Sequence, residues 1–292
     1  AGNIYVTEYG NHTVRKITPQ GMVSTLAGGF NGFQDGTGTD ARLFRPSDII
    51  MGNDGFLYVA DTWNNRIRKI SLNGEVTTLA GSSGGYAEGT GSNAKFDKPT
   101  GLTMDANGNI YVTDLENERI RKITPNGLVS TLAGGTRGYD DGNGTAAQFR
   151  DPTGIVINSN NELFVTDYFG RTVRKITLNG EVTTYAGRAG ISGSFDRERT
   201  ASSFGTPYGI ALDSQGDILV SDWTHNNIRK ISTSIDEVTT LAGLGNTSSG
   251  NSGNTDGIAS EARFNNPAGI FVAPNGTVYI ADYDNHRIRI IQ

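Results

Sequence analysis

Short apolar runs alternate with turn residues along this chain, and the same order of positions returns throughout its length. Residues 5–18, YVTEYGNHTVRKIT, read as an apolar run, an acidic residue, a Gly-Asn turn and a second run that mixes basic and apolar residues. Two such runs joined by a short turn predict a β-hairpin. Closely similar segments stand at 58–71, 111–124, 164–177, 219–232 and 279–292. The pattern therefore predicts six copies of one hairpin.

The spacing of the hairpins indicates a repeat architecture. The acidic residue of each hairpin recurs in steps of 53, 53, 53, 55 and 60, at Glu8, Asp61, Asp114, Asp167, Asp222 and Asp282. A nearly constant period of this size is typical of stacked supersecondary units. Within residues 99–134, four β-runs follow one another through the turns ANGN, LENE and PNG. Each unit is thus predicted to be an antiparallel meander, whose four strands we name a, b, c and d.

Strands b and c of a unit carry apolar or long side chains on both faces, as in NIYVT and RIRKI. A small sheet of this kind needs cover on both faces, and identical sheets stacked on one another supply it. The predicted fold class is all-β: a six-bladed β-propeller of four-stranded antiparallel blades, centred near 8, 61, 114, 167, 222 and 282. We expect a single domain over residues 1–292. A parallel β-helix is disfavoured because its rungs are shorter than this hairpin.

The first and last blades are predicted to be incomplete. The chain starts at strand b of its first unit and ends at strand c of its sixth, so 22 strands are present where six full units would have 24. We therefore expect three-stranded first and last blades. The missing strands would come from residues outside this segment or remain absent.

Composition narrows the classes of protein that fit. The 40 glycines suit many tight turns, and the absence of cysteine excludes disulfides, thiolate metal sites and a cysteine nucleophile. No apolar run approaches the length of a membrane span, so we expect no membrane insertion. A net charge of −5 disfavours binding to nucleic acid or to anionic lipid.

The repeated words resemble those of a known family. The order Pro-x-Gly-Ile, then Gly-Asn-Ile-Tyr-Val-Thr-Asp, then Asn-x-Arg-Ile-Arg is similar to the NHL repeat, and a loose Asn-His pair stands at 11–12 and 285–286. The resemblance covers essentially the whole chain, and the DGTGTDARLF linker is most similar to the bacterial-type variant. It implies a six-bladed propeller. Such propellers mostly bind proteins, RNA or other ligands, and lyases and lactonases are among their relatives.

The acids and arginines that occur once in every unit are interpreted as structural. The arginines stand in strand c, at Arg15, Arg68, Arg121, Arg174, Arg229 and Arg289. A residue that every blade uses performs a task that every blade needs, such as capping a turn or forming an ion pair. Since strand c holds much of the basic charge, little remains for binding RNA.

Catalytic chemistry finds little support in the sequence. The three histidines, His12, His225 and His286, all fall in b–c turns, and Asp48 is the one carboxylate just after a linker proline. One carboxylate does not build a catalytic metal centre. We therefore predict no catalytic residues, no metal and no cofactor. A metal-dependent lyase or lactonase remains the alternative.

The linkers between units carry a second pattern. Three of them share Gly-aromatic-x-acid-Gly-x-Gly, with Asp35, Glu88 and Asp141 as the acids. We expect each acid to cap a glycine turn while Phe33, Tyr86 or Tyr139 packs below it. A calcium loop is the alternative, though each linker offers only one or two carboxylates. The fourth and fifth linkers depart from this pattern, and we expect a function specific to this protein to lie where the repeat is broken.

Aromatic residues gather in the b–c turns, which are predicted to share one face with the linkers. The predicted ligand-binding residues are Tyr9, Trp63, Tyr168, Phe169, Tyr208, Trp223 and Tyr283, together with the cations Arg45, Lys98 and Arg150, which would favour an acidic ligand. Exposed aromatic rings beside polar groups suit sugar stacking or a protein hot spot. The alternative is that the rings pack against adjacent linkers.

The sequence thus predicts a non-catalytic binding module for a glycan, peptide or protein. A structural spacer or oligomerising element within a longer chain is a further alternative to the enzyme named above. Low lysine content and abundant Thr, Asn, Ser and Gly favour an extracellular, cell-surface or periplasmic setting in a bacterium.

Overall fold

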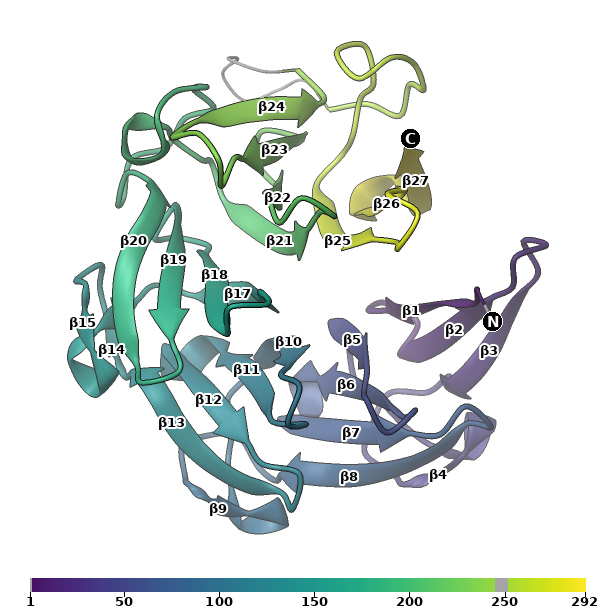
Figure 1. Ribbon diagram of the computed structural model, residues 1–292. Coiled ribbons are helices and arrows are strands. Elements are labelled where there is room, and N and C mark those ends of the chain that lie inside the picture. Colours follow the sequence, from purple (N-terminus) through teal and green to yellow (C-terminus); the bar gives the residue numbers. More distant parts are fainter. Residues whose placement is uncertain (1, 245–251) are drawn as a thin grey trace. The chain divides into compact units, whose positions relative to one another are not determined.

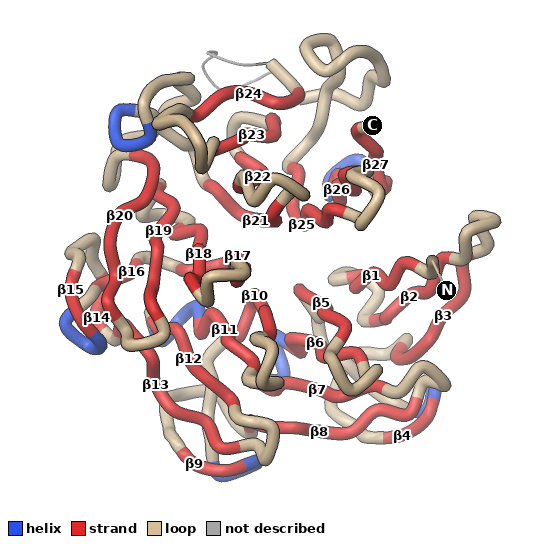
Figure 2. Tube along the Cα trace, viewed as in Figure 1, coloured by secondary structure: helices blue, strands red, loops and turns tan. Residues whose placement is uncertain are grey.

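A computed structural model describes residues 2–244 and 252–292 of the chain, and almost all of its regular structure is β-strand (Figures 1 and 2). The chain forms two compact units, unit 1 over residues 1–132 and unit 2 over residues 133–292. Each of the six repeats forms its own antiparallel sheet. The prediction of an all-β, six-bladed β-propeller fold is confirmed. That residues 1–292 make one domain stays a prediction.

Unit 1 contains the first three blades. Blade 1 has β1 (Ile4–Glu8), β2 (Thr13–Ile17) and β3 (Val23–Gly28). Blade 2 has β5 (Asp48–Met51), β6 (Leu57–Asp61), β7 (Arg66–Ile70) and β8 (Glu75–Gly81), with the short β4 (Gly36–Thr37) at its edge. Blade 3 has β10 (Pro99–Met104), β11 (Ile110–Asp114), β12 (Arg119–Ile123) and β13 (Leu128–Gly134), with β9 (Gly89–Thr90) at its edge.

Unit 2 contains the other three blades. Blade 4 has β17 (Pro152–Ile157), β18 (Glu162–Asp167), β19 (Thr172–Thr177) and β20 (Glu181–Gly187), with β15 (Gly142–Asn143) at its edge. Blade 5 has β21 (Pro207–Leu212), β22 (Ile218–Asp222), β23 (Asn227–Ile231) and β24 (Val238–Ala242). Blade 6 has β25 (Pro267–Val272), β26 (Val278–Asp282) and β27 (Arg287–Ile291). A separate parallel pair joins β14 (Thr136–Arg137) and β16 (Gln148–Phe149).

Short 3₁₀ turns occupy two kinds of place. Those in the b–c turns are η2 (Thr62–Asn64), η4 (Leu115–Asn117) and η7 (Tyr283–Asn285). Those in the linkers are η1 (Gly38–Asp40), η3 (Gly91–Asn93), η5 (Gly144–Ala146) and η6 (Arg199–Ala201). No helix among the described residues has the length and apolar character needed to cross a bilayer.

The number of strands agrees with the number predicted from the sequence in blades 1 and 6 and exceeds it in blades 2, 3 and 4. Blades 1 and 6 have three strands, as predicted. Blades 2, 3 and 4 have five, because two linker residues pair with the outermost strand of the blade, as β4 does with β8. The linkers are therefore part of the sheets that they precede.

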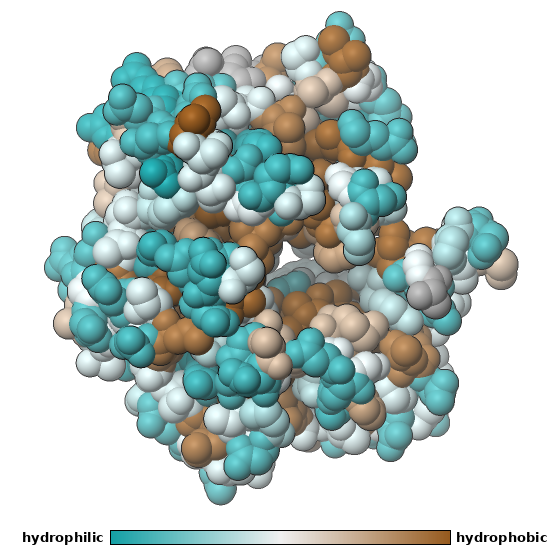
Figure 3. All heavy atoms as spheres, viewed as in Figure 1, coloured by the Kyte–Doolittle hydropathy of each residue, from teal (hydrophilic) through white to brown (hydrophobic). Residues whose placement is uncertain are grey.

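The hydrophobic cores lie between neighbouring blades of the same unit. In unit 1, Val14 of β2 and Val59 of β6 belong to one buried cluster. In unit 2, Val173 of β19 clusters with Val220 of β22. In the face that Figure 3 shows, hydrophilic side chains cover most of the turns, and hydrophobic ones appear between the sheets. Within each unit, neighbouring sheets thus cover each other's apolar faces.

A glycine at the end of strand d is required by the close approach of the b–c turn. Gly81 has φ +100°, and a Cβ added to it would lie 2.3 Å from the carbonyl oxygen of Asn65. Gly55 also has positive φ, at +81°, but nothing lies within 4 Å of its added Cβ. An alanine at either position would have to adopt an unfavourable positive φ, but only at Gly81 would its methyl group also collide with the backbone of the turn.

We expect Gly55→Ala to lower the free energy of unfolding by about 1–2 kcal/mol, the cost of a left-handed alanine. Gly81→Ala should cost about 1–3 kcal/mol more, because the methyl group must push the turn away. Urea unfolding of the two variants measures the difference. Equal losses would show that the turn does not constrain Gly81.

Candidate functional site

A buried ion pair connects strands b and c to the linker in blade 2. Asp61 Oδ2 accepts a 2.6 Å hydrogen bond from Arg68 Nη1, and both side chains are completely buried. The same guanidinium donates to the carbonyl oxygens of Arg42 and Gln34, each at 3.1 Å, and to Asp35 Oδ1 at 2.6 Å. One side chain of strand c therefore fixes three points of the linker that precedes its blade.

The buried Arg–Asp pair recurs in blades 3, 4 and 6, and blade 1 has a partly exposed Arg15–Glu8 pair at 3.0 Å. The Arg–Asp distance is 2.8 Å for Arg121 and Asp114, 3.5 Å for Arg174 and Asp167, and 3.0 Å for Arg289 and Asp282. In blade 5, Asp222 instead accepts from the backbone N–H groups of Gly205 and Thr206, while Arg229 donates to Ser203 and Phe195 carbonyls. The structural role predicted for the repeated acids and arginines is confirmed.

The pKa of the buried Asp114 carboxyl reflects two opposing influences. Burial raises the pKa of the Asp114 carboxyl to about 6, while its hydrogen-bond donors and the charge of Arg121 oppose that rise. At pH 7 the pair is therefore still ionic. The two terminal nitrogens of Arg121 donate to Asp114 and to two linker carbonyls, as a buried charge requires, whereas its buried Nε has no hydrogen-bond partner.

The prediction that the linker acids cap glycine turns is wrong. Asp35 and Asp141 each accept from the buried arginine of their blade, and a strand-d threonine donates to the same Asp oxygen at 3.0 Å. Phe33 is 49% exposed and lies 3.7 Å from the guanidinium carbon of Arg66, so it does not pack beneath the turn. The reason is that a buried guanidinium needs more acceptors than strands b and c supply.

The fourth linker has the same contact although its sequence departs from the pattern. Asp196 accepts from Arg229 at 2.7 Å, and Thr240 donates to it from strand d. Part of the fifth linker, residues 245–251, lies outside the described residues. Its residue Asp256 accepts from Arg289.

The b–c turns lie directly on the ends of the linkers. The backbone N–H of Trp63 donates to the carbonyl of Phe44 at 3.0 Å, and Trp223 donates to Thr206 at 3.1 Å in the same way. The predicted sharing of one face by turns and linkers is confirmed within these blades. Because the linker is held by the buried arginine, the turn and its aromatic residue are held too.

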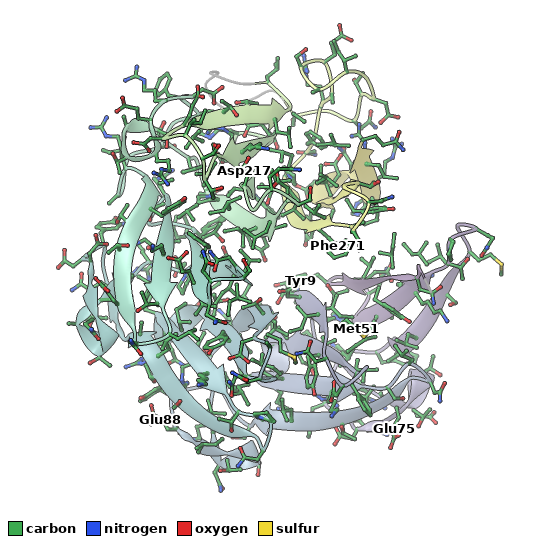
Figure 4. All side chains as sticks on the ribbon, viewed as in Figure 1. Tyr9, Met51, Glu75, Glu88, Asp217 and Phe271 are labelled. Atoms are coloured by element: carbon green, nitrogen blue, oxygen red, sulfur yellow. The ribbon has the colours of Figure 1, made fainter. Side chains whose placement is uncertain are left out.

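In unit 1, two of the predicted rings come together with two of the predicted cations. We call this group, with Phe44 added, the Trp63 cluster: Tyr9, Phe44, Arg45, Trp63 and Lys98. Trp63 Nε1 donates to the Tyr9 hydroxyl at 2.8 Å, and Tyr9 follows β1 (Figure 4). The guanidinium carbon of Arg45 lies 4.6 Å from the Trp63 ring centroid and 5.4 Å from that of Tyr9. Trp63 remains 40% exposed.

The two cations of this cluster differ in their partners. Lys98 Nζ forms a 2.8 Å ion pair with Glu116 and lies 5.4 Å from the Trp63 centroid. Arg45 has no carboxylate within ion-pair distance among the residues that the structure describes. It is a partly buried cation surrounded by rings, and its charge is not compensated.

Phe44 is a member of the cluster that sequence reasoning missed. Its ring centroid lies 5.6 Å from that of Trp63 and 5.4 Å from that of His12. In the later linkers the equivalent positions hold Asp97 and Asn265, whose N–H groups bond the strand-b acid as that of Phe44 does. A single aromatic residue at a position that holds Asp97, Arg150, Gly205 or Asn265 in the other linkers was the signal available in the sequence.

In unit 2 the other five rings form what we call the Trp223 row. Consecutive ring centroids lie 4.8, 6.0, 5.3 and 5.2 Å apart in the order Phe169, Tyr168, Tyr208, Trp223 and Tyr283. Trp223 is partly buried between its two neighbours, whereas Phe169 and Tyr283 are 42% and 40% exposed. The rings pack mainly on one another. Arg150, the third predicted cation, lies 6.0 Å from the Phe169 centroid and donates to the Tyr139 hydroxyl.

Asp48, the one carboxylate singled out on strand a, has only backbone partners. It accepts from the N–H groups of Ile49 and Leu102, both at 2.8 Å, and burial raises its pKa to about 6. Across the described parts of the chain, no three His, Cys, Asp or Glu residues are grouped so as to hold a metal ion. The absence of a metal or cofactor stays a prediction.

Comparison with known proteins identifies the family. The model of the teneurin NHL domain matches residues 189–292, and that of the SMP-30/gluconolactonase/LRE-like region matches residues 50–133. The chain is 26% identical over 327 residues to human NHL repeat-containing protein 2, and the alignment includes 99% of this chain. The chain belongs to the NHL-repeat family. Mouse teneurin-3 is 29% identical over 334 residues, and the chloroplastic protein SUPPRESSOR OF QUENCHING 1 of Arabidopsis thaliana is 30% identical over 291 residues.

These NHL-repeat relatives are much longer than this chain. The matches span 44% of NHL repeat-containing protein 2, 27% of the Arabidopsis protein and 12% of teneurin-3. Because these relatives come from animals and a plant, the bacterial origin predicted from the linker stays a prediction.

Solved structures with the same fold come from bacteria. An auxiliary nutrient binding protein of Bacteroides ovatus has a TM-score of 0.74 at 17% identity, with 100% of this chain and 66% of that chain covered. Virginiamycin B lyase of Staphylococcus aureus has a TM-score of 0.64 at 17% identity, with 100% and 78% covered. At this identity the likeness shows the fold alone.

The first two blades of this NHL domain are linked by a hydrogen bond that depends on pH. The N–H of Arg45 donates to His12 Nδ1 at 3.2 Å, whereas in later blades Lys98 and Asn266 donate to the side-chain oxygens of Asn65 and Asn226. Burial, and then the charge of Arg45, lower the pKa of His12 below its ordinary 6.5. A lowered pKa means that His12 contributes stability above pH 6.5 and that this contribution is lost as the pH falls.

We therefore expect His12→Asn, which copies the later blades, to remove part of the acid sensitivity. Asparagine keeps the acceptor and cannot gain a proton beside Arg45. In urea unfolding at pH 7, 6 and 5, the free energy of unfolding of the variant should rise relative to that of the parent as the pH falls. A difference that stays constant over this range would contradict the assignment.

Proposed function

We propose that this NHL domain is a non-catalytic binding module that recognises an acidic, extended segment of a protein partner. The binding surface is the face of the b–c turns and linkers, and its centre is the Trp63 cluster. The observation that supports this most strongly is the uncompensated guanidinium of Arg45 among three rings.

Arg45 differs from the buried strand-c arginines of blades 2 to 6, each of which has a carboxylate partner, and the protein as a whole has a net charge of −5. A planar guanidinium binds a carboxylate with two parallel hydrogen bonds, and a partly dehydrated setting strengthens them. The exposed indole of Trp63 adds contact area beside that charge.

A protein ligand fits the cluster better than a glycan does. Sugar rings stack on open aromatic faces, but in the Trp63 cluster the rings of Phe44 and Trp63 pack on each other with an angle of 51° between their planes. The neighbouring rings of the Trp223 row likewise pack together, at 42–45°. Similarity to NHL-repeat proteins, a family that mostly binds proteins, RNA or other ligands, supports a binding role. The lyase alternative has the fold in its favour but no metal-ligand group among the residues described.

Two further features of the module are proposals that rest on the sequence. Its composition favours an extracellular, cell-surface or periplasmic setting. Its similarity to short stretches of much longer relatives supports a place within a longer chain.

We expect peptides selected from a random displayed library on the purified protein to be enriched in Asp or Glu next to an apolar residue. Their affinity should fall about 10- to 100-fold in Arg45→Gln and by about 1–3 kcal/mol in Trp63→Ala. Titration calorimetry at two salt concentrations measures both, and binding should weaken as salt rises.

Arg42→Gln is the matched control. Arg42 is an exposed arginine of the same linker whose side chain makes no ion pair in the described structure. Its replacement should leave both the affinity and the melting temperature unchanged. Selection of neutral or basic peptides, equal binding by Arg45→Gln, or binding of a glycan array that depends on Trp223 alone would each argue against the proposal.

A further inference from the structure

Seven Asn-Gly pairs occur in this chain, beginning at residues 31, 73, 107, 126, 143, 179 and 275. In such a pair the backbone nitrogen of the glycine can attack the side-chain amide of the asparagine, because no Cβ hinders its approach. The attack requires a free nitrogen. A glycine whose N–H already donates a hydrogen bond is held away from the amide, so the fold decides which pairs react.

Backbone hydrogen bonds hold the nitrogen in six of these pairs. Five of the glycines lie in a–b or c–d turns and donate to the carbonyl three residues earlier at 2.8–3.0 Å: Gly74, Gly108, Gly127, Gly180 and Gly276. The sixth, Gly144, lies in the linker before blade 4 and donates to the carbonyl of Gly180 at 2.9 Å. Asn143 is therefore an exposed asparagine beside a held nitrogen.

Asn31-Gly32 is the exception. The pair lies in the linker between β3 and β4 (Figure 1), and the N–H of Gly32 donates to no acceptor within residues 2–244 and 252–292. Asn31 is exposed, and its side chain makes no hydrogen bond with any residue of those two ranges. Both reacting groups of this pair are thus free.

The equivalent nitrogen is bonded in every later linker. Each of these glycines donates to the carbonyl of a phenylalanine eleven residues on, at 2.9–3.2 Å: Gly85 to Phe96, Gly138 to Phe149, Gly193 to Phe204 and Gly253 to Phe264. In the first linker Leu43 replaces the phenylalanine, and Gly32 does not donate to it. The asparagine is not part of the repeat either, since Gly84 and Arg137 occupy its position in the next two linkers.

We propose that Asn31-Gly32 is a site of spontaneous modification in the folded protein, through a succinimide to isoaspartate. The nitrogen of Gly32 forms a bond to Cγ of Asn31, and its proton leaves with the amide group as ammonia. Water from the solvent then opens the succinimide ring. Attack of water at Cγ gives aspartate, and attack at the main-chain carbonyl carbon of Asn31 gives isoaspartate. The proposal is independent of the binding partner proposed above.

Isoaspartate at this position alters the support of the b–c turn of blade 2. It routes the main chain through Cβ and Cγ of residue 31 and so lengthens the chain directly before Gly32. The carbonyl of Gly32 accepts a 2.6 Å hydrogen bond from Asn64 Nδ2, and Asn64 follows Trp63 in the turn. Asn117 makes the same bond to Gly85 in blade 3. The modification therefore displaces one of the bonds that fix the turn on its linker.

The test keeps the folded chain at mildly alkaline pH and follows every Asn-Gly pair by peptide mapping with mass spectrometry. Methylation by protein isoaspartyl methyltransferase identifies the isoaspartate. We expect Asn31 to react about tenfold faster than Asn143, a factor that corresponds to about 1.4 kcal/mol, near the net strength of one hydrogen bond. In urea the two rates should become equal. Asn31→Gln should be stable at residue 31 and unchanged at Asn143, because glutamine would have to close a larger ring.

Hydrogen exchange measures the effect on the turn. In the modified chain the amides of Trp63 and Asn65, which are bonded to backbone carbonyls, should exchange about tenfold faster, while that of Glu118 in blade 3 stays unchanged. The same incubation of Asn31→Gln should leave all three amides protected. Reaction of Asn31 no faster than that of Asn143, or a preference for Asn31 that persists in urea, would overturn the proposal. Unaltered protection of Trp63 in the modified chain would overturn the effect on the turn.

Discussion

The buried ion pair between strands b and c is the interaction on which the rest of this structure depends. Removing a carboxylate and a guanidinium from water costs several kcal/mol for each ion, and the pair is stable only if its remaining hydrogen-bonding groups are satisfied. Asp61 and the two terminal nitrogens of Arg68 meet this condition with two linker carbonyls, a linker acid and a linker N–H, while the buried Nε of Arg68 has no hydrogen-bond partner. The linker is therefore the means by which the blade satisfies its buried charges.

This constraint explains how a variable surface stands on a uniform scaffold. The linker end bonds the first residues of the b–c turn, so fixing the linker also fixes the turn. The side chains after the strand-b acid do not take part in the pair and are free to differ: Trp63 in blade 2, Leu115 in blade 3 and Trp223 in blade 5. Scaffold and recognition residues are thus separated by position within each repeat.

How far the sequence predicts the structure follows from the same distinction. The blade number, the strand order and the three-stranded end blades were predictable because strand b, strand c and their turn are contiguous and recur at a nearly constant step. The partner of each linker acid was not, since Asp35 and Arg68 are 33 residues apart and nothing local joins them. The same holds for the division of the rings into the Trp63 cluster and the Trp223 row, which depends on contacts between repeats.

The irregular linkers show where a repeat pattern misleads. The fourth linker lacks the shared Gly-aromatic motif, yet its Asp196 makes the same bond as Asp35, because the requirement comes from the buried arginine and not from the linker itself. Conversely, Phe44 stands in a regular linker and joins the candidate site. Individual function is therefore better sought in single substitutions beside the b–c turns than in the length of a linker.

Native-state hydrogen exchange on Arg68→Met tests this account most directly, with Lys69→Met as the control. Lys69 is the next residue of the same strand, and its ion pair with Asp54 lies at the surface. We expect Arg68→Met to raise the exchange rates of the amides of Gln34, Arg42 and Phe44 by about 100-fold or more. This factor corresponds to roughly 3 kcal/mol, the cost of breaking a buried ion pair. The amides of β6 and β7 should keep more of their protection. Lys69→Met should change neither group. Equal loss of protection in linker and strands, or no loss in the linker, would contradict the claim that the buried pair holds the linker in place.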